Sequence, residues 1–185
     1  MRRIGARWKC ARLRDDRLEV YAATRAARSG RKEHRHLCLQ LNAKRTMDAP
    51  TLETDVRVMF FDTDAGGVVH NLAYLRFIET NRSLLGEKLG WQLDELMVTR
   101  LCPVVVRTEI DYRSPARLWD QLKVKGCLEK FGRTRFWCGF TITRASDNTP
   151  LVTCRQMLVV VKLPEFKVQR LPEHWSREYG GLQEG

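Results

Sequence analysis

The chain has 185 residues, 43% of them hydrophobic, which suits one domain with a sizeable core and excludes collagen-like, coiled-coil and wholly disordered classes. It contains no run of 18 apolar residues, so we expect no transmembrane segment. The net charge of +11 lies at one end, because residues 1–46 hold 14 Lys and Arg against 4 Asp and Glu, whereas residues 47–185 hold 19 against 18.

The basic segment 1–46 shows little hydrophobic periodicity and lacks the apolar region of a secretory signal. Its arginines are typical of a mitochondrial transit peptide, but its acidic residues count against that interpretation, and a nucleic-acid-binding arm is a further alternative. We expect an extension that is disordered, or one that results from a start site placed upstream of Met47, because its composition cannot offset the entropy of ordering. The folded domain is expected to span residues 47–185 and to bind no nucleic acid.

The hydrophobic pattern of this domain predicts its helices and strands in chain order. Alternation over residues 56–61 predicts a strand, and apolar residues at helical spacing predict a largely buried helix over residues 71–89. Asn71 is the expected N-cap of this helix and Gly90 its C-cap. Residues 91–100 are expected to form a loop or short helical turn. Four strands are then predicted at residues 103–112, 120–130, 134–144 and 151–163, which gives an α+β fold with an antiparallel sheet packed on one helix.

The cysteines carry no pattern of a metal or disulfide site. No Cys-x-x-Cys pair occurs, and no histidine stands at ligand spacing from a cysteine, so we expect buried, reduced thiols, no metal, and a cytoplasmic location. They are Cys10, Cys38, Cys102, Cys127, Cys138 and Cys154.

Chemistry is expected in the loop Asp62-Thr63-Asp64-Ala65-Gly66-Gly67, between the first strand and the helix. The first amides of a helix lack internal partners and lie at its positive end, so they can polarise a carbonyl group. Asp64 stands seven residues before the helix and can supply a carboxylate to the same point, while the glycines allow close approach of a ligand. From spacing alone, a plain turn and an incomplete calcium loop remain alternatives.

The stretch Asp62-Thr63-Asp64-Ala65-Gly66-Gly67-Val68-Val69-His70-Asn71, with Tyr74, resembles the signature of hot-dog acyl-CoA thioesterases of the 4-hydroxybenzoyl-CoA thioesterase type. The similarity is greatest to the Tol-Pal-associated, YbgC-like branch, and Ile110-Asp111-Tyr112-Arg113-Ser114-Pro115-Ala116 resembles a strand end of that branch. The resemblance covers about residues 56–172 and implies a hot-dog fold, in which a curved antiparallel sheet wraps one long helix.

The resemblance also implies roles for single residues. Asp64 is the catalytic carboxylate, as nucleophile or general base, and the Asn71 backbone N–H is the donor to the thioester carbonyl. Tyr74 matches an aromatic residue of the family. The branch often has an aromatic residue and then His where this chain has His70 and then Asn71, so no acid–base role is assigned to His70. The residues expected to line the acyl site are Gly66, Gly67, Val68, Val69, His70, Asn71 and Tyr74.

The function implied is hydrolysis of an acyl-CoA thioester to a carboxylate and free CoA, without metal or other cofactor. Homodimers or homotetramers are implied as well, with a possible association with the cell envelope or membrane surface. The alternative is a non-catalytic hot-dog protein that binds acyl groups or a cell-envelope partner. Glu79, on the helix, is expected to be structural.

Overall fold

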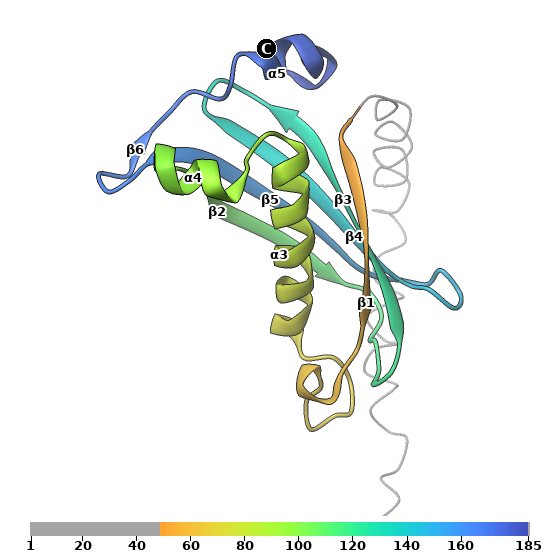
Figure 1. Cartoon of the computed structure of the whole chain (residues 1–185). Coiled ribbons are helices and arrows are strands. Elements are labelled where there is room, and N and C mark those ends of the chain that lie inside the picture. The colour runs from red at the N-terminus through yellow and green to blue at the C-terminus, as the bar shows by residue number, and fades with distance from the viewer. Residues whose placement is uncertain (1–48, 185) are drawn as a thin grey trace, which may run out of the picture. The chain divides into compact units, whose positions relative to one another are not determined.

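The computed structural model describes residues 49–184 of the chain. They form a curved antiparallel sheet, and one long helix, α3 (Asn71–Lys88), lies across one face of it (Figure 1). The expected α+β arrangement is therefore confirmed. The extension expected at residues 1–46 lies outside the described residues and stays a prediction.

Six strands make up the sheet of this region, and all of their pairings are antiparallel. Five follow the order β1-β3-β4-β5-β2, and the short β6 pairs with β5. The four strands expected after the helix are present within two residues of their predicted bounds. The strands are β1 (Thr51–Arg57), β2 (Leu101–Tyr112), β3 (Gln121–Phe131), β4 (Arg135–Arg144), β5 (Pro150–Lys162) and β6 (Lys167–Val168).

The other described helices are short. They are α4 (Leu93–Thr99), α5 (His174–Glu178) and the 3₁₀ turns η2 (Phe60–Asp62) and η3 (Gly180–Leu182). None of the helices in residues 49–184 is long and apolar enough to cross a membrane. The long helix ends one residue before its predicted end, at Lys88, and Gly90 follows its cap in the left-handed region, with φ +90°.

The prediction of a strand over residues 56–61 is wrong at residues 58–61, and the strand begins earlier, at Thr51. Strand β1 ends at Arg57, and the chain then turns because the Met59 N–H donates to the Asp62 carboxylate at 2.8 Å. Phe60 and Phe61 lie in or beside this turn and are 78% and 74% exposed. Alternation alone could not reveal the turn, since the carboxylate that closes it stands outside the apolar pattern.

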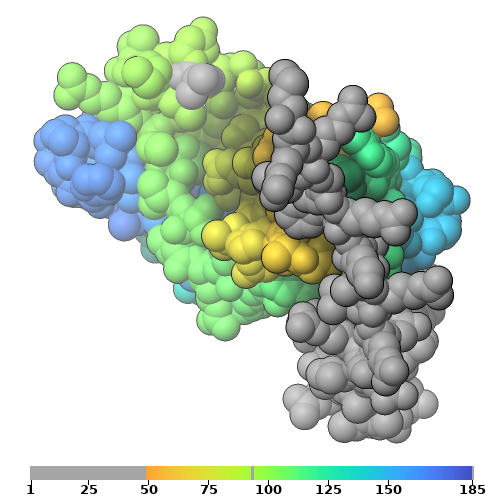
Figure 2. All heavy atoms as spheres, turned by 90° about the horizontal axis from the view of Figure 1, so that it is seen from below, coloured from red at the N-terminus to blue at the C-terminus, as the bar shows by residue number. Residues whose placement is uncertain are grey.

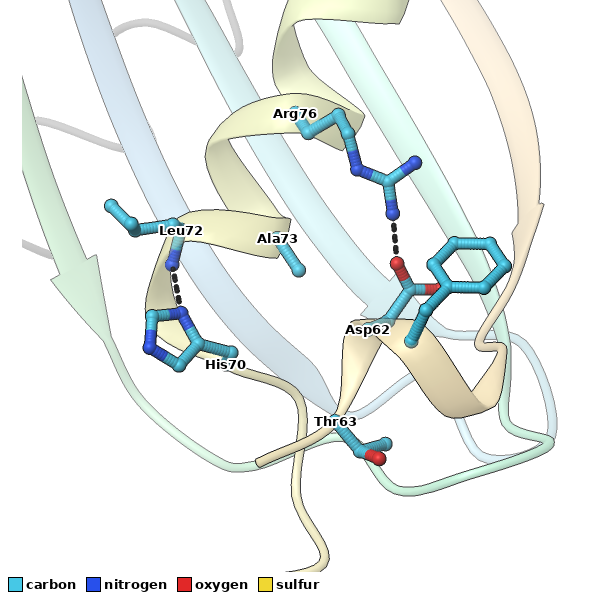
Figure 3. A pocket seen from close by; sticks show the side chains of 7 residues that line it. Asp62, Thr63, His70, Leu72, Ala73 and Arg76 are labelled. Atoms are coloured by element: carbon cyan, nitrogen blue, oxygen red, sulfur yellow. Dashed lines mark hydrogen bonds and ion pairs between the residues drawn. The ribbon is translucent and has the colours of Figure 1, made fainter. Parts of the chain in front are cut away.

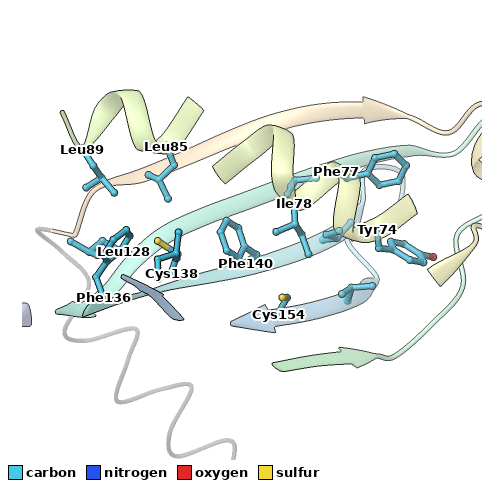
Figure 4. Close-up of a cluster of buried hydrophobic side chains, with 14 of the residues drawn as sticks. Tyr74, Phe77, Ile78, Leu85, Leu89, Leu128, Phe136, Cys138, Phe140 and Cys154 are labelled. Carbon is cyan, nitrogen blue, oxygen red and sulfur yellow. The ribbon is translucent and has the colours of Figure 1, made fainter. Parts of the chain in front are cut away.

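The core lies between α3 and the sheet (Figure 4). The buried helix positions recur every three or four residues, as expected for one helix face. They are Ala73, Tyr74, Phe77, Ile78, Asn81 and Leu85. Leu72 and Leu84, two of the apolar residues of the helix that was expected to be largely buried, are exposed. The helix therefore buries one side rather than most of its circumference.

A polar side chain fixes α3 on the sheet. The Asn81 side chain is fully buried, and its amide donates to the Val124 carbonyl at 2.9 Å and to the Thr54 hydroxyl at 3.0 Å. Its carbonyl oxygen lies over Gly126, where an added Cβ would be 2.2 Å away. The glycine in β3 thus makes room for the helix side chain, and the two together set where α3 sits along the sheet.

The C-terminal residues close the end of the core that is remote from the helix N-terminus. Trp175, on α5, is fully buried against the rings of Phe131, Phe136 and Trp91, and its indole N–H donates to the Leu89 carbonyl at 3.2 Å. The sequence did not predict α5, because its five residues are too few to show helical periodicity.

Candidate active site

The loop between η2 and α3 is a small hairpin. Thr63 pairs with Val69, the Asp64 N–H donates to the Val68 carbonyl at 2.9 Å, and the Gly67 N–H donates back to the Asp64 carbonyl at 2.9 Å. Gly67 adopts φ +70°, which favours glycine because it has no Cβ. These hydrogen bonds fix the backbone of Asp64 within the hairpin.

Two neighbours hold the hairpin in place. The Val69 N–H donates to the Ala116 carbonyl at 2.9 Å, and Val68 pairs with Arg117 in the connection between β2 and β3. On the other side, the His70 N–H donates to the Asp62 carbonyl at 2.8 Å. In Figure 2 the residues of this loop, coloured yellow, lie on the surface of the domain. The loop is thus both accessible and fixed by backbone contacts.

The two aspartates of the loop have different surroundings. The Asp62 side chain is 2% exposed and accepts hydrogen bonds from the Met59 N–H and the Arg76 guanidinium, with which it forms an ion pair. The Asp64 side chain is exposed, and one of its oxygens accepts the Gly66 N–H at 2.8 Å. Asp62 therefore shapes the loop, whereas Asp64 presents its carboxylate to solvent.

The cap of α3 differs from the predicted one. Asn71 is the first helical residue, and His70 is the N-cap, whose Nδ1 accepts the Leu72 N–H at 3.1 Å. The Ala73 N–H donates to the His70 carbonyl at 2.9 Å. Within residues 49–184, the Asn71 N–H has no protein acceptor. The sequence pointed to Asn71 because Asn is a common cap, but an imidazole nitrogen serves the same purpose.

Two tyrosines support this end of the helix. Tyr74 is buried, and its hydroxyl accepts the Ala116 N–H at 2.8 Å, so it braces the β2–β3 connection. The Tyr112 hydroxyl donates to the Asn71 carbonyl at 3.2 Å. Burial raises the pKa of both phenols, which keeps them neutral at physiological pH.

A depression of about 390 Å³ lies at the N-terminal end of α3 (Figure 3). Its apolar side is formed by Phe61, Leu72 and Ala73, and polar groups form the rest. Of the predicted site residues, His70 lines it. Asp64 is not part of its lining but stands on the adjoining hairpin. The sequence analysis missed Phe61, which it placed in a strand, and Arg76, which no motif singled out. The full lining is Phe61, Asp62, Thr63, His70, Leu72, Ala73 and Arg76.

Thiol chemistry does not suit the two buried cysteines of β4 and β5. Burial raises the pKa of the Cys154 thiol to about 12 and raises that of Cys138 further still. Since the thiolate is the nucleophile, these side chains are inert at neutral pH. No cluster of three His, Cys, Asp or Glu side chains able to hold a metal occurs in residues 49–184.

The chain is similar to known thioesterases. The family model described as the thioesterase-like superfamily matches residues 58–178. The acyl-CoA thioester hydrolase YbgC of Escherichia coli is 30% identical over 133 residues, which cover 72% of this chain and 98% of that protein. The 1,4-dihydroxy-2-naphthoyl-CoA hydrolase of Synechocystis is 30% identical over 128 residues, covering 68% of this chain and 92% of that protein.

A solved structure agrees with the sequence similarities. The 1,4-dihydroxy-2-naphthoyl-CoA thioesterase Slr0204 from Synechocystis superposes with a TM-score of 0.62 at 26% identity, covering 69% of this chain and 94% of that one. The family match contains the loop that carries Asp64, α3 and strands β2 to β6. The matches to the individual proteins span nearly the whole length of these relatives.

Proposed function

The chain belongs to the thioesterase-like superfamily of hot-dog proteins, in its YbgC-like branch, and we propose that it hydrolyses acyl-CoA thioesters with Asp64 as the acting carboxylate. One observation carries the assignment of the site. An exposed aspartate stands on a fixed hairpin next to a helix whose first amide, Asn71 N–H, has no acceptor among the described residues. A bound thioester can contact the Asp64 carboxylate and the Asn71 N–H at the same time.

The distances along the hairpin suit this use. His70 is paired with Asp62, and Asp64 is paired with Val68, so Asp64 lies two residues along the hairpin from His70, the N-cap of the helix. Two residues of extended chain span about 7 Å. A thioester placed between them can point its carbonyl oxygen at the Asn71 N–H and its carbonyl carbon at the carboxylate, each at a contact distance of about 3 Å.

Two routes give the same products. In the first, an Asp64 oxygen attacks the carbonyl carbon, the C–S bond breaks, CoA leaves as a thiolate that takes up a proton, and water then hydrolyses the mixed anhydride. In the second, Asp64 takes a proton from water as the water attacks. In both, the Asn71 N–H and the positive end of α3 stabilise the oxyanion. Neither route requires a cofactor.

The remaining predicted site residues take supporting roles in this proposal. Gly66 and Gly67 keep the hairpin tip free of side chains where the thioester and pantetheine arm pass. Val68, Val69 and His70 lead from the tip to the helix, and Tyr74 holds the β2–β3 connection against them. The apolar side of the depression, at Phe61 and Leu72, suits an acyl or aromatic group.

We also infer a homodimer, or a tetramer built from dimers, formed through strand β2. This strand of 12 residues lies at one edge of the sheet, so its outer backbone groups can pair with a second copy. Exposed Val105 and Val106 lie on it. Such pairing would join the sheets of two copies edge to edge into one continuous sheet.

The proposed location is cytoplasmic, with an association at the membrane surface or cell envelope as a further possibility from the resemblance. Support comes from the cysteines, since the four in the described part of the chain carry free thiols. Free thiols persist in reducing compartments.

Release of free CoA from a panel of short, long and aromatic acyl-CoAs tests the proposed function. Asp64→Asn should lower kcat/KM by at least about 100-fold on every substrate that the wild type hydrolyses, because a positioned base or nucleophile is lost. Asp94→Asn is the matched control, since Asp94 is also exposed and accepts a neighbouring backbone N–H, but lies on α4. Hydrolysis at the wild-type rate by Asp64→Asn would refute the assignment, and a non-catalytic binder would hydrolyse none of the panel.

A further inference from the structure

His70 has a feature that the proposed hydrolysis does not yet use. Its Nδ1 accepts the Leu72 N–H at 3.1 Å, and an imidazole nitrogen that accepts a hydrogen bond carries no proton. The imidazole in this arrangement is therefore neutral, with its proton on Nε2. The side chain is exposed and lines the depression at the end of α3.

This cap determines which amide remains available to a ligand. Of the first three amides of α3, Leu72 donates to the His70 ring and Ala73 to the His70 carbonyl, and only Asn71 is left without an acceptor in residues 49–184. His70 thus accepts hydrogen bonds from Leu72 and Ala73, the two amides that follow the proposed donor. It also holds the backbone that carries this donor, because its own N–H is bonded to the Asp62 carbonyl.

Protonation of the ring would remove the cap. A proton on Nδ1 would face the Leu72 N–H, and the new positive charge would stand at the positive end of the helix. The ring must then rotate away, and the backbone at Asn71 loses a restraint. Nearby charges do not compensate, because Asp62 is already bonded to Arg76 and Met59, and Asp64 accepts the Gly66 N–H. The Tyr112 hydroxyl, a further titratable group at this end of the helix, donates to the Asn71 carbonyl.

We propose that His70 is a positioning residue whose neutral imidazole fixes the Asn71 N–H for catalysis, so that protonation of this ring switches hydrolysis down. The inference rests on the proposed function, in which Asn71 supplies the donor. Histidine is the side-chain type whose charge generally changes between about pH 5 and 8, so the test compares these two limits.

The kinetic test compares pH profiles of kcat for the wild type, His70→Asn and His174→Asn. The wild type should lose about 10-fold in kcat between pH 8 and pH 5, since small displacements of a catalytic group cost up to about 100-fold. His70→Asn, which can cap the helix but cannot titrate, should be slower at pH 8 but flat over this range. His174→Asn, on α5, should keep the wild-type profile. A wild-type limb that persists in His70→Asn overturns the proposal.

A second readout does not depend on activity. The Leu72 and Asn71 amide signals in ¹H–¹⁵N spectra of the full chain should shift between pH 8 and pH 5 in the wild type and stay in place in His70→Asn. Unchanged Leu72 signals in the wild type would refute the cap switch even if Asp64 proved essential. Conversely, shifted signals in a protein that hydrolyses no acyl-CoA would refute the proposed function and leave the cap switch standing.

Discussion

At the scale of single residues, the two aspartates of the loop show how position decides role. They are two residues apart and identical in chemistry, yet Asp62 is buried in an ion pair with Arg76 and Asp64 is exposed. The sequence could rank them only through the family resemblance, because spacing alone does not reveal which carboxylate the 3₁₀ turn buries. The same holds for His70, whose capping role depends on a ring orientation that no pattern encodes.

These surroundings predict opposite effects for two similar substitutions. Asp62→Asn should destabilise the fold by about 1–3 kcal/mol, since it weakens charged hydrogen bonds to a buried group, and thermal denaturation should show a loss of about 2–4 °C per kcal/mol. Its kcat, measured well below the melting temperature, should stay within about 10-fold of the wild type. Asp64→Asn should do the reverse, with little change in melting temperature. Equal losses of activity in both variants would contradict the separation of roles.

At the scale of elements, the sequence predicted the long helix and the four following strands well, because each shows a clear hydrophobic period. It failed where side chains interrupt the period. Residues 58–61 leave the sheet because Asp62 captures a backbone N–H, and α3 buries Asn81, a polar residue that an apolar stripe cannot predict. The first sets where the chain turns before α3, and the second sets how α3 lies on the sheet.

The docking of α3 can be tested at Gly126. An alanine there would place its Cβ 2.2 Å from the Asn81 side-chain oxygen and 3.0 Å from the Phe140 ring, so the helix must shift. Overpacking of this kind costs about 1–3 kcal/mol, and chemical denaturation should report it. Gly180→Ala is the control, because no atom lies within 4 Å of its added Cβ. Equal stability of the two variants would mean that Asn81 does not fix the helix.

At the scale of the whole molecule, the β2 edge of the sheet is available for pairing with a strand of a second copy. Strand β2 has no neighbour on its outer side within residues 49–184, and a long exposed edge invites pairing with another strand. The fold class was predictable from the sequence pattern, whereas assembly was implied by the family resemblance alone, since strand order and edge exposure arise only from the tertiary structure.

Light scattering of the purified chain tests the assembly. The wild type should have a mass of two or four times 21.6 kDa, and Val106→Lys, which places a charge on the β2 edge, should shift it towards a single chain. Val168→Lys is a matched control, because both valines are 51% exposed and Val168 lies on β6. A wild type that is monomeric and active would contradict the inferred dimer.

The central claim is that Asp64 acts on a thioester held at the start of α3. The most direct measurement compares binding with turnover in Asp64→Asn, using calorimetry with a non-hydrolysable thioether analogue of the preferred acyl-CoA and steady-state hydrolysis of that acyl-CoA itself. The account predicts a Kd within about 3-fold of the wild type and a kcat lower by at least about 100-fold. An unchanged kcat, or a loss of binding that explains the whole loss of activity, would contradict it.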